Sequence, residues 1–101
     1  MILIQPTTGA VKRTVTIHLH RVNTSLGILG ILEETEDILL EIPTVLSPDV
    51  NNDSHWTSLN CNDITFTLTK HKNRLVFAGS IGKIRINKPV TSNPVGVVWL
   101  W

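Results

Sequence analysis

Residues 63–87 alternate apolar and polar side chains so regularly that they constrain the fold of this 101-residue chain more than any other stretch. In Ile64–Thr69 the apolar residues fall on one face of an extended strand and the threonines on the other. Threonine, isoleucine and phenylalanine also favour strands. Lys70–Asn73 is predicted to turn the chain into a second strand, Leu75–Ala78, and a third follows at Lys83–Asn87. The pattern indicates antiparallel β-structure.

Strand patterns continue on both sides of this stretch. Val11–Val22 is the longest, with branched apolar residues on one face and threonine and histidine on the other. Before it, Met1–Gln5 is predicted to be a short strand that Pro6 stops, and Thr7–Ala10 a turn. Val95–Trp101 is predicted to be the last strand of the domain.

The segment Leu26–Ile42 fits two different structures. Its apolar residues recur at helical spacing, and Pro43 would end such a helix. Gly27 and Gly30 oppose a helix, because each glycine in a helix interior costs about 1 kcal/mol relative to alanine. The acidic cluster Glu33–Asp37 also divides the segment into two apolar runs, which suits a hairpin with an acidic loop. We favour the hairpin; a helix here would make the fold α+β.

Composition then sets the class. With 42% hydrophobic residues the chain can bury one core, so we expect a single β domain over residues 1–101. We predict an all-β fold, an antiparallel β-sandwich or small barrel with a jelly-roll-like arrangement among the options, of roughly seven or eight strands. The one cysteine, Cys61, excludes an intrachain disulfide.

The amino-terminal residues and the apolar runs bear on where the protein works. Met1–Gln5 lacks the basic start of a signal peptide, and no apolar run approaches the ~20 residues of a membrane span. We therefore expect no secretion by a signal peptide and no membrane partner. The expected location is the cytoplasm, or a particle assembled there.

Charge is unevenly distributed along the chain. Residues 1–50 hold three basic and six acidic residues, whereas residues 51–101 hold six basic and two acidic ones. The asymmetry predicts two surface patches of opposite sign, on the condition that the fold does not interleave the two halves. The basic candidates for meeting an anionic partner are Lys70, Lys72, Arg74, Lys83, Arg85 and Lys88. Nucleic acid is the less favoured partner, because single-strand binders add stacking aromatics and only Phe77 lies near.

Two short patterns carry possible metal ligands. His18 and His20 are two residues apart, so both rings would face one side of a strand and could share a metal ion. No carboxylate follows within the next few residues to complete such a site. Asp49–Asp53 places oxygens at the first positions of an EF-hand loop, but Ser54 replaces the glycine and Asn60 the bidentate glutamate. We therefore predict no metal site at either pattern.

The polar stretch Ser47–Asn62 is predicted to be a long loop, and loops of this length often carry function. It holds His55 and Cys61, a pair that could supply a nucleophile and its base. No third orienting group or glycine-rich oxyanion loop accompanies them, so we predict no enzyme activity, no catalytic residue and no cofactor. Trp56 would either anchor a protein or glycan, or close one end of the core.

The carboxyl-terminal run is apolar on both faces, since Trp99 and Trp101 share one face and Leu100 lies on the other. A strand that is apolar on both faces belongs between two packed layers. One layer would be the domain's own core, and we hypothesise that the second is a neighbouring chain. The predicted interface residues are Trp99, Leu100 and Trp101, together with Trp56.

These observations favour a non-enzymatic structural module that mediates protein–protein contacts. We expect a homo-oligomer, or assembly with other protein subunits, in a larger particle such as a viral or phage decoration or tail component. The alternative is a small module that binds a ligand or glycan through residues 47–62.

The metal prediction can be checked by thermal melting. Zinc, calcium or a chelator should leave the melting temperature unchanged, because His18, His20 and Asp49–Asp53 each lack part of a ligand set. A clear rise with either metal at modest concentration would contradict it, since a ligand that binds the native state stabilises that state.

Overall fold

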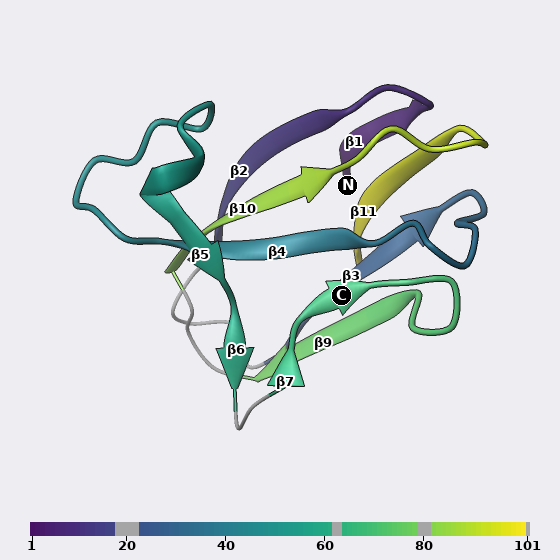
Figure 1. Cartoon of the computed structure of the whole chain (residues 1–101). Coiled ribbons are helices and arrows are strands. Elements are labelled where there is room, and N and C mark those ends of the chain that lie inside the picture. Colours follow the sequence, from purple (N-terminus) through teal and green to yellow (C-terminus); the bar gives the residue numbers. More distant parts are fainter. Residues whose placement is uncertain (18–22, 62–63, 79–81, 101) are drawn as a thin grey trace.

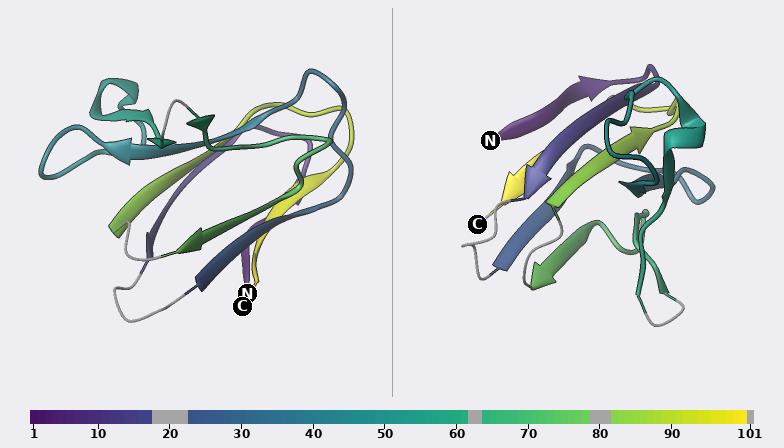
Figure 2. Two further views of the ribbon diagram at one scale, coloured as in Figure 1. Left: turned by 90° about the horizontal axis from the view of Figure 1, so that it is seen from below. Right: turned by 90° about the vertical axis from the view of Figure 1, so that its left-hand side faces the viewer.

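The computed structural model describes residues 1–17, 23–61, 64–78 and 82–100, and within them the chain is a sandwich of two antiparallel sheets (Figure 1; Figure 2 shows the two layers from other directions). The all-β sandwich is therefore confirmed. The elements are β1 (Ile2–Thr7), β2 (Val11–Ile17), β3 (Asn23–Leu29), β4 (Ile38–Pro43), η1 (Asp53–His55), β5 (Trp56–Ser58), β6 (Asn60–Cys61), β7 (Ile64–Thr65), β8 (Thr67–Leu68), β9 (Arg74–Ala78), β10 (Gly82–Lys88) and β11 (Val95–Leu100).

The first sheet, sheet A, has the strand order β1-β11-β3-β9, and the second, sheet B, has the order β2-β10-β4-β5. β8 pairs with Ile38 and Leu39 at the start of β4, whereas β5 pairs with Glu41–Pro43 at its end. β6 and β7 form a separate two-stranded ribbon. Most connections cross from one sheet to the other, so consecutive strands seldom pair with each other. Strands from opposite ends of the chain lie side by side instead, as β1 does with β11.

This crossing corrects the predicted hairpin in Leu26–Ile42. The segment does form two strands around an acidic turn, and no helix occupies it. The strands belong to different sheets, however, because β3 pairs with β11 and β9 while β4 pairs with β10 and β5. Gly30 opens the turn at φ 107°, and a Cβ there would collide with the Pro94 carbonyl oxygen. The sequence shows the two apolar runs, but it does not show which strands each run pairs with.

The alternating stretch at residues 63–87 also divides between the sheets. Thr69 and Lys72 exchange backbone hydrogen bonds of 2.9 and 3.2 Å, which confirms the tight turn. The strand before the turn is shorter than predicted, because the chain breaks at Phe66 into β7 and β8. β8 joins sheet B and β9 joins sheet A, so this turn closes one end of the sandwich.

Two further predicted boundaries and the predicted number of strands differ from the structure. β1 continues through Pro6 to Thr7, which is allowed because an edge strand tolerates a residue without an N–H. Ser47–Asn62 is not one loop, since it contains η1, β5 and β6. These short strands raise the number in the described ranges above the predicted seven or eight.

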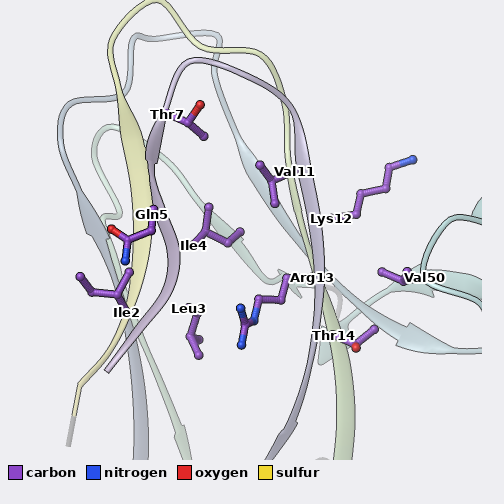
Figure 3. Close-up of a pocket in the computed structure, with 10 residues that line it drawn as sticks. All are labelled: Ile2, Leu3, Ile4, Gln5, Thr7, Val11, Lys12, Arg13, Thr14 and Val50. Atoms are coloured by element: carbon purple, nitrogen blue, oxygen red, sulfur yellow. The ribbon is translucent and has the colours of Figure 1, made fainter.

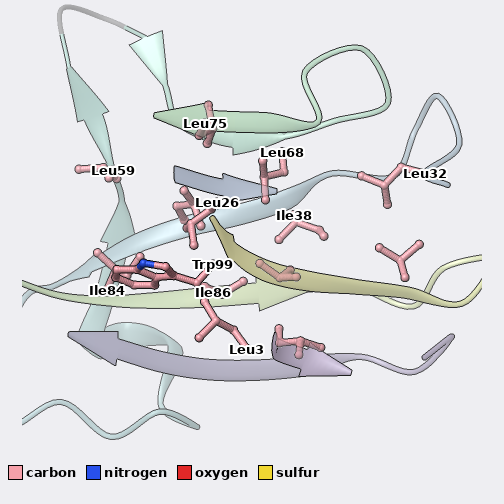
Figure 4. Packing of buried hydrophobic residues seen from close by; sticks show 14 residues of the cluster. Leu3, Leu26, Leu32, Ile38, Leu59, Leu68, Leu75, Ile84, Ile86 and Trp99 are labelled. Atoms are coloured by element: carbon pink, nitrogen blue, oxygen red, sulfur yellow. The ribbon is translucent and has the colours of Figure 1, made fainter. Parts of the chain in front are cut away.

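The core lies between the inner faces of the two sheets (Figure 4). Leu26 and Val97 of sheet A and Ile84 and Ile86 of sheet B are fully buried. Trp99 joins this cluster and is 5% exposed. The remaining buried apolar members are Leu3, Ile4, Leu32, Ile38, Leu40, Leu59, Leu68, Leu75 and Val95.

One prediction follows from the contact between β1 and β11. A Cβ at Gly96 would collide with the Ile4 carbonyl oxygen and lie 2.8 Å from the Pro6 nitrogen, all backbone of the neighbouring strand. Gly96→Ala should therefore destabilise the fold by about 1–3 kcal/mol, measured by denaturant unfolding. Gly9→Ala is the control, because its Cβ would meet only the Thr7 hydroxyl at 3.6 Å. Equal stability of the two variants would contradict this account of the β1–β11 contact.

Candidate protein interface

The outer face of sheet A carries apolar side chains that the core does not use. The strand register decides which residues face outward, because Leu26, Val97 and Trp99 face the core and their neighbours along each strand face away. We call the set of outward-facing residues the sheet A outer face. Its described members are Ile2, Ser25, Gly27, Leu29, Arg74, Val76, Gly96 and Val98.

Across the strands these residues form rows. Ile2, Val98, Gly27 and Arg74 lie in one register row from β1 to β9. Ile2 is 43% and Val76 62% exposed, whereas Leu29, within β3, and Val98, within β11, are half-buried. Arg74 is the one charged residue among the described members, and it lies on the edge strand β9. The face is therefore apolar at its centre.

Of the four predicted interface residues, two have described side chains, and the monomer encloses both. Trp99 packs in the core and Trp56 is also 5% exposed. Leu100 lies opposite Ser25 in the backbone register, but its side chain falls outside the described residues, as does Trp101. The exposed apolar surface of sheet A thus comes from neighbours of the tryptophans. Reading β3 and β9 for apolar residues on both faces could have found Leu29 and Val76.

Trp56 is held against the outer face of sheet B by the segment that precedes it. Its indole Nε1 donates a 2.9 Å hydrogen bond to the Asp49 carbonyl oxygen. The Arg85 guanidinium lies 5.4 Å from the ring centroid, within cation–π range. The interface role predicted for Trp56 would require this enclosed side chain to be exposed first.

Arg85 is the centre of this second cluster and is 1% exposed. It faces Glu41 across the β10–β4 register and binds that carboxylate through two 3.0 Å hydrogen bonds, from Nε and Nη2. Nη1 donates to the Val50 carbonyl oxygen at 2.9 Å and to Asp53 Oδ1 at 3.0 Å. Because a buried guanidinium requires such partners, the contacts fasten the segment before β5 onto sheet B.

The predicted basic patch does not form one surface. Arg85 is enclosed as described, and Lys88 is fully buried, with its ammonium donating to Gly9 O, Pro89 O and Thr91 Oγ1 at 2.7, 2.9 and 3.1 Å. Burial lowers the pKa of Lys88, and the Glu36 charge partly offsets this. Lys70 and Lys72 lie in the turn after β8, whereas Lys83 lies near the start of β10, at the opposite end of that strand from Lys88. The anionic-partner hypothesis therefore loses Arg85 and Lys88.

The acidic turn contacts basic and polar groups of the second half of the chain. Glu34 lies 3.0 Å from His71 and 3.7 Å from Lys70, and the His71 hydrogen bond lowers the pKa of Glu34. Other pairs join Lys12 with Asp53 and Arg85 with Glu41. The fold thus interleaves the two halves at these residues, so the condition for separate patches of opposite sign is not met there.

The possible metal ligands and nucleophiles are placed as follows. His18 and His20 lie outside the described residues. Asp49 Oδ1 accepts from the Asn51 amide, and Asp53 Oδ1 accepts from Lys12 and Arg85. His55 Nδ1 accepts a 3.0 Å hydrogen bond from the Asp49 amide. The Cys61 side chain is not among those that the structure describes. Within the described ranges, no three His, Cys, Asp or Glu side chains gather as a metal site.

Comparison with known proteins gives no further lead. No protein-family model, no curated protein and no solved structure matches this chain. Among the described residues there is also no helix with the length and apolar character needed to cross a membrane.

The acidic turn generates a pH prediction. Glu36 accepts hydrogen bonds from the Glu33 and Ser92 amides at 2.9 and 2.8 Å, and these bonds lower its pKa below the ordinary 4.5. A lowered folded-state pKa adds stability above the ordinary pKa, and that stability is lost as pH falls through the folded value. Glu36→Gln should therefore melt at a lower temperature at pH 7, and the gap should shrink as the pH falls below the ordinary value.

The control for this prediction is Asp37→Asn. Asp37 is exposed in the same turn and makes no side-chain hydrogen bond with the described residues. Its replacement should change the melting temperature little at any pH. Equal effects of the two substitutions, or a Glu36→Gln gap that stays constant from pH 7 into acid, would refute the role assigned to Glu36.

Proposed function

We propose that this protein is a non-enzymatic assembly module whose sheet A outer face packs against a second copy of the chain. One observation carries the proposal: Ile2 and Val76 are 43% and 62% exposed on the outer face of sheet A, and the half-buried Leu29 and Val98 add to the same apolar surface. Sheet B differs, because residues around Trp56 and Asp53 cover part of its outer face. An exposed apolar sheet face is a surface that a partner protein can bury.

A second copy suits this face because of its charge. In a twofold interface the same patch contributes from both subunits, so a patch must be complementary to itself. An apolar centre meets that condition, since packing it on its own copy buries no charge without a partner. Arg74 lies at the edge, where it can stay in water.

The size of the face indicates a weak contact. Four strands about 4.8 Å apart give a face only about 15 Å wide between its outer strands. A stable complex usually buries about 800 Å² on each partner, which such a face does not reach alone. A repeated particle suits weak contacts, because many act together. A decoration or tail component of a virus or phage is such a setting, and we infer it as the context of the module.

The ligand- or glycan-binding alternative has less support. It requires an accessible aromatic ring in residues 47–62, and Trp56 is enclosed by the Asp49 carbonyl and Arg85. We therefore place the assembly role first.

The proposal can be tested by the mass of the protein in solution. Sedimentation across a concentration series reaching about 1 mM should show wild-type mass rising toward the dimer, at the affinity expected of a small interface. Val76→Glu should remain monomeric, because the substitution buries a charge at the contact, and it should keep its melting temperature.

The matched control is Val90→Glu. Val90 is 71% exposed and lies in the connection between β10 and β11, outside the set of residues that forms the sheet A outer face. This variant should associate as the wild type does. Monomeric wild-type protein over the whole range, or identical behaviour of the two variants, would overturn the proposal.

A further inference from the structure

A groove of about 670 Å³ runs between β1 and β2 (Figure 3). β1 is the terminal strand of sheet A and β2 the terminal strand of sheet B, so among the described strands neither has a partner on this side. Leu3 and Ile4 line the groove from β1, and Val11 and Arg13 line it from β2. The groove meets the sheet A outer face at Ile2, which belongs to both, and its other lining residues are not members of that face.

Arg13 gives the groove its chemical character. It lies opposite Ile86 in the β10–β2 register, which places it on the inward face of sheet B beside apolar residues. Figure 3 shows its side chain directed into the space between the two strands. Arg13 is exposed, and no carboxylate of the described residues forms an ion pair with it. The groove therefore combines apolar walls with a guanidinium that is available to an acid.

An inward-pointing charge on an edge strand has a protective effect, because it opposes pairing with another strand. Whether Arg13 opposes an incoming strand depends on the side chain that this strand places next to the guanidinium. An apolar or basic strand would leave Arg13 desolvated without a partner, which is costly. A strand that brings a carboxylate can form a two-pronged hydrogen-bonded pair with it instead. The same residue thus excludes most strands and selects acidic ones.

The free edge that would receive the strand is β2. Its seven residues pair with β10 in an unbroken register, whereas the register of β1 with β11 shifts twice. A regular edge can extend its sheet by one strand through main-chain hydrogen bonds. Alternate side chains of the added strand would then contact Val11 and Ile2, the accessible apolar residues that β2 and β1 contribute to the lining, because Leu3 and Ile4 are only 2% and 3% exposed.

We infer that this groove binds an extended segment of a partner protein, which adds to the β2 edge and places an aspartate or glutamate against Arg13 between apolar side chains. The partner differs from a second copy of this chain. Within the described residues the one carboxylate on a strand is Glu41, and it is committed to Arg85.

Synthetic peptides test the inference directly. The probe is acetyl-Ser-Val-Thr-Glu-Thr-Val-Ser-amide, in which valines flank the glutamate on one face of a strand. Matched peptides carry glutamine or lysine in place of the glutamate. Titration of the labelled full chain to about 2 mM peptide, followed by amide NMR shifts, reports both affinity and site. The glutamate peptide should shift β2 amides and bind about tenfold tighter than the glutamine peptide, with the lysine peptide weakest.

Charge reversal distinguishes a specific ion pair between Arg13 and the peptide carboxylate from general electrostatic attraction between the protein and the peptide. Arg13→Glu should invert the preference toward the lysine peptide, while Lys72→Glu, an equal charge change in the exposed turn after β8, should not. Absence of binding by every peptide, shifts at β9 instead of β2, or an unchanged order with Arg13→Glu would overturn the inference. Because Val76→Glu should leave peptide binding intact, failure here is distinguishable from failure of the sheet A contact.

Discussion

Burial of two inner apolar faces against each other is the constraint on which the rest of the structure depends. Strand side chains alternate between faces, so each row that enters the core leaves a second row outside. In sheet B part of the outer row is enclosed by the chain itself, since Arg85 binds Glu41 across the strands and Trp56 lies over its guanidinium. In sheet A the outer row includes two exposed apolar residues, Ile2 and Val76. This difference between the sheets is the physical basis for placing an interface on sheet A.

Local pattern was sufficient to predict the class of the fold. The alternation around Phe66, the glycines of Leu26–Ile42 and the tight turn at Thr69–Lys72 all indicated strands, and strands are present. Pairing was not predictable, because whether a turn joins neighbours in one sheet or crosses between sheets depends on long-range packing. The predicted hairpin at Leu26–Ile42 failed for that reason.

The residues of the candidate sites were less predictable from the sequence than the class of the fold. A basic residue in an alternating strand is expected to face water, yet Arg85 lies under a covering segment and Lys88 inside a ring of oxygens. Their burial depends on residues distant in sequence, such as Glu41 and Gly9, that no local pattern connects to them. The tryptophans are the largest apolar residues in the sequence, whereas the exposed apolar surface of sheet A is made of smaller residues such as Ile2 and Val76.

The central claim is that copies of the chain meet through the sheet A outer face. Isotope-filtered NMR on an equal mixture of labelled and unlabelled protein, at a concentration where the mass begins to rise, reports contacts between copies alone. The account predicts intermolecular contacts among the methyl groups of Ile2, Leu29, Val76 and Val98. Contacts confined to exposed residues elsewhere, such as Leu46 or Val90, or none at all, would contradict it.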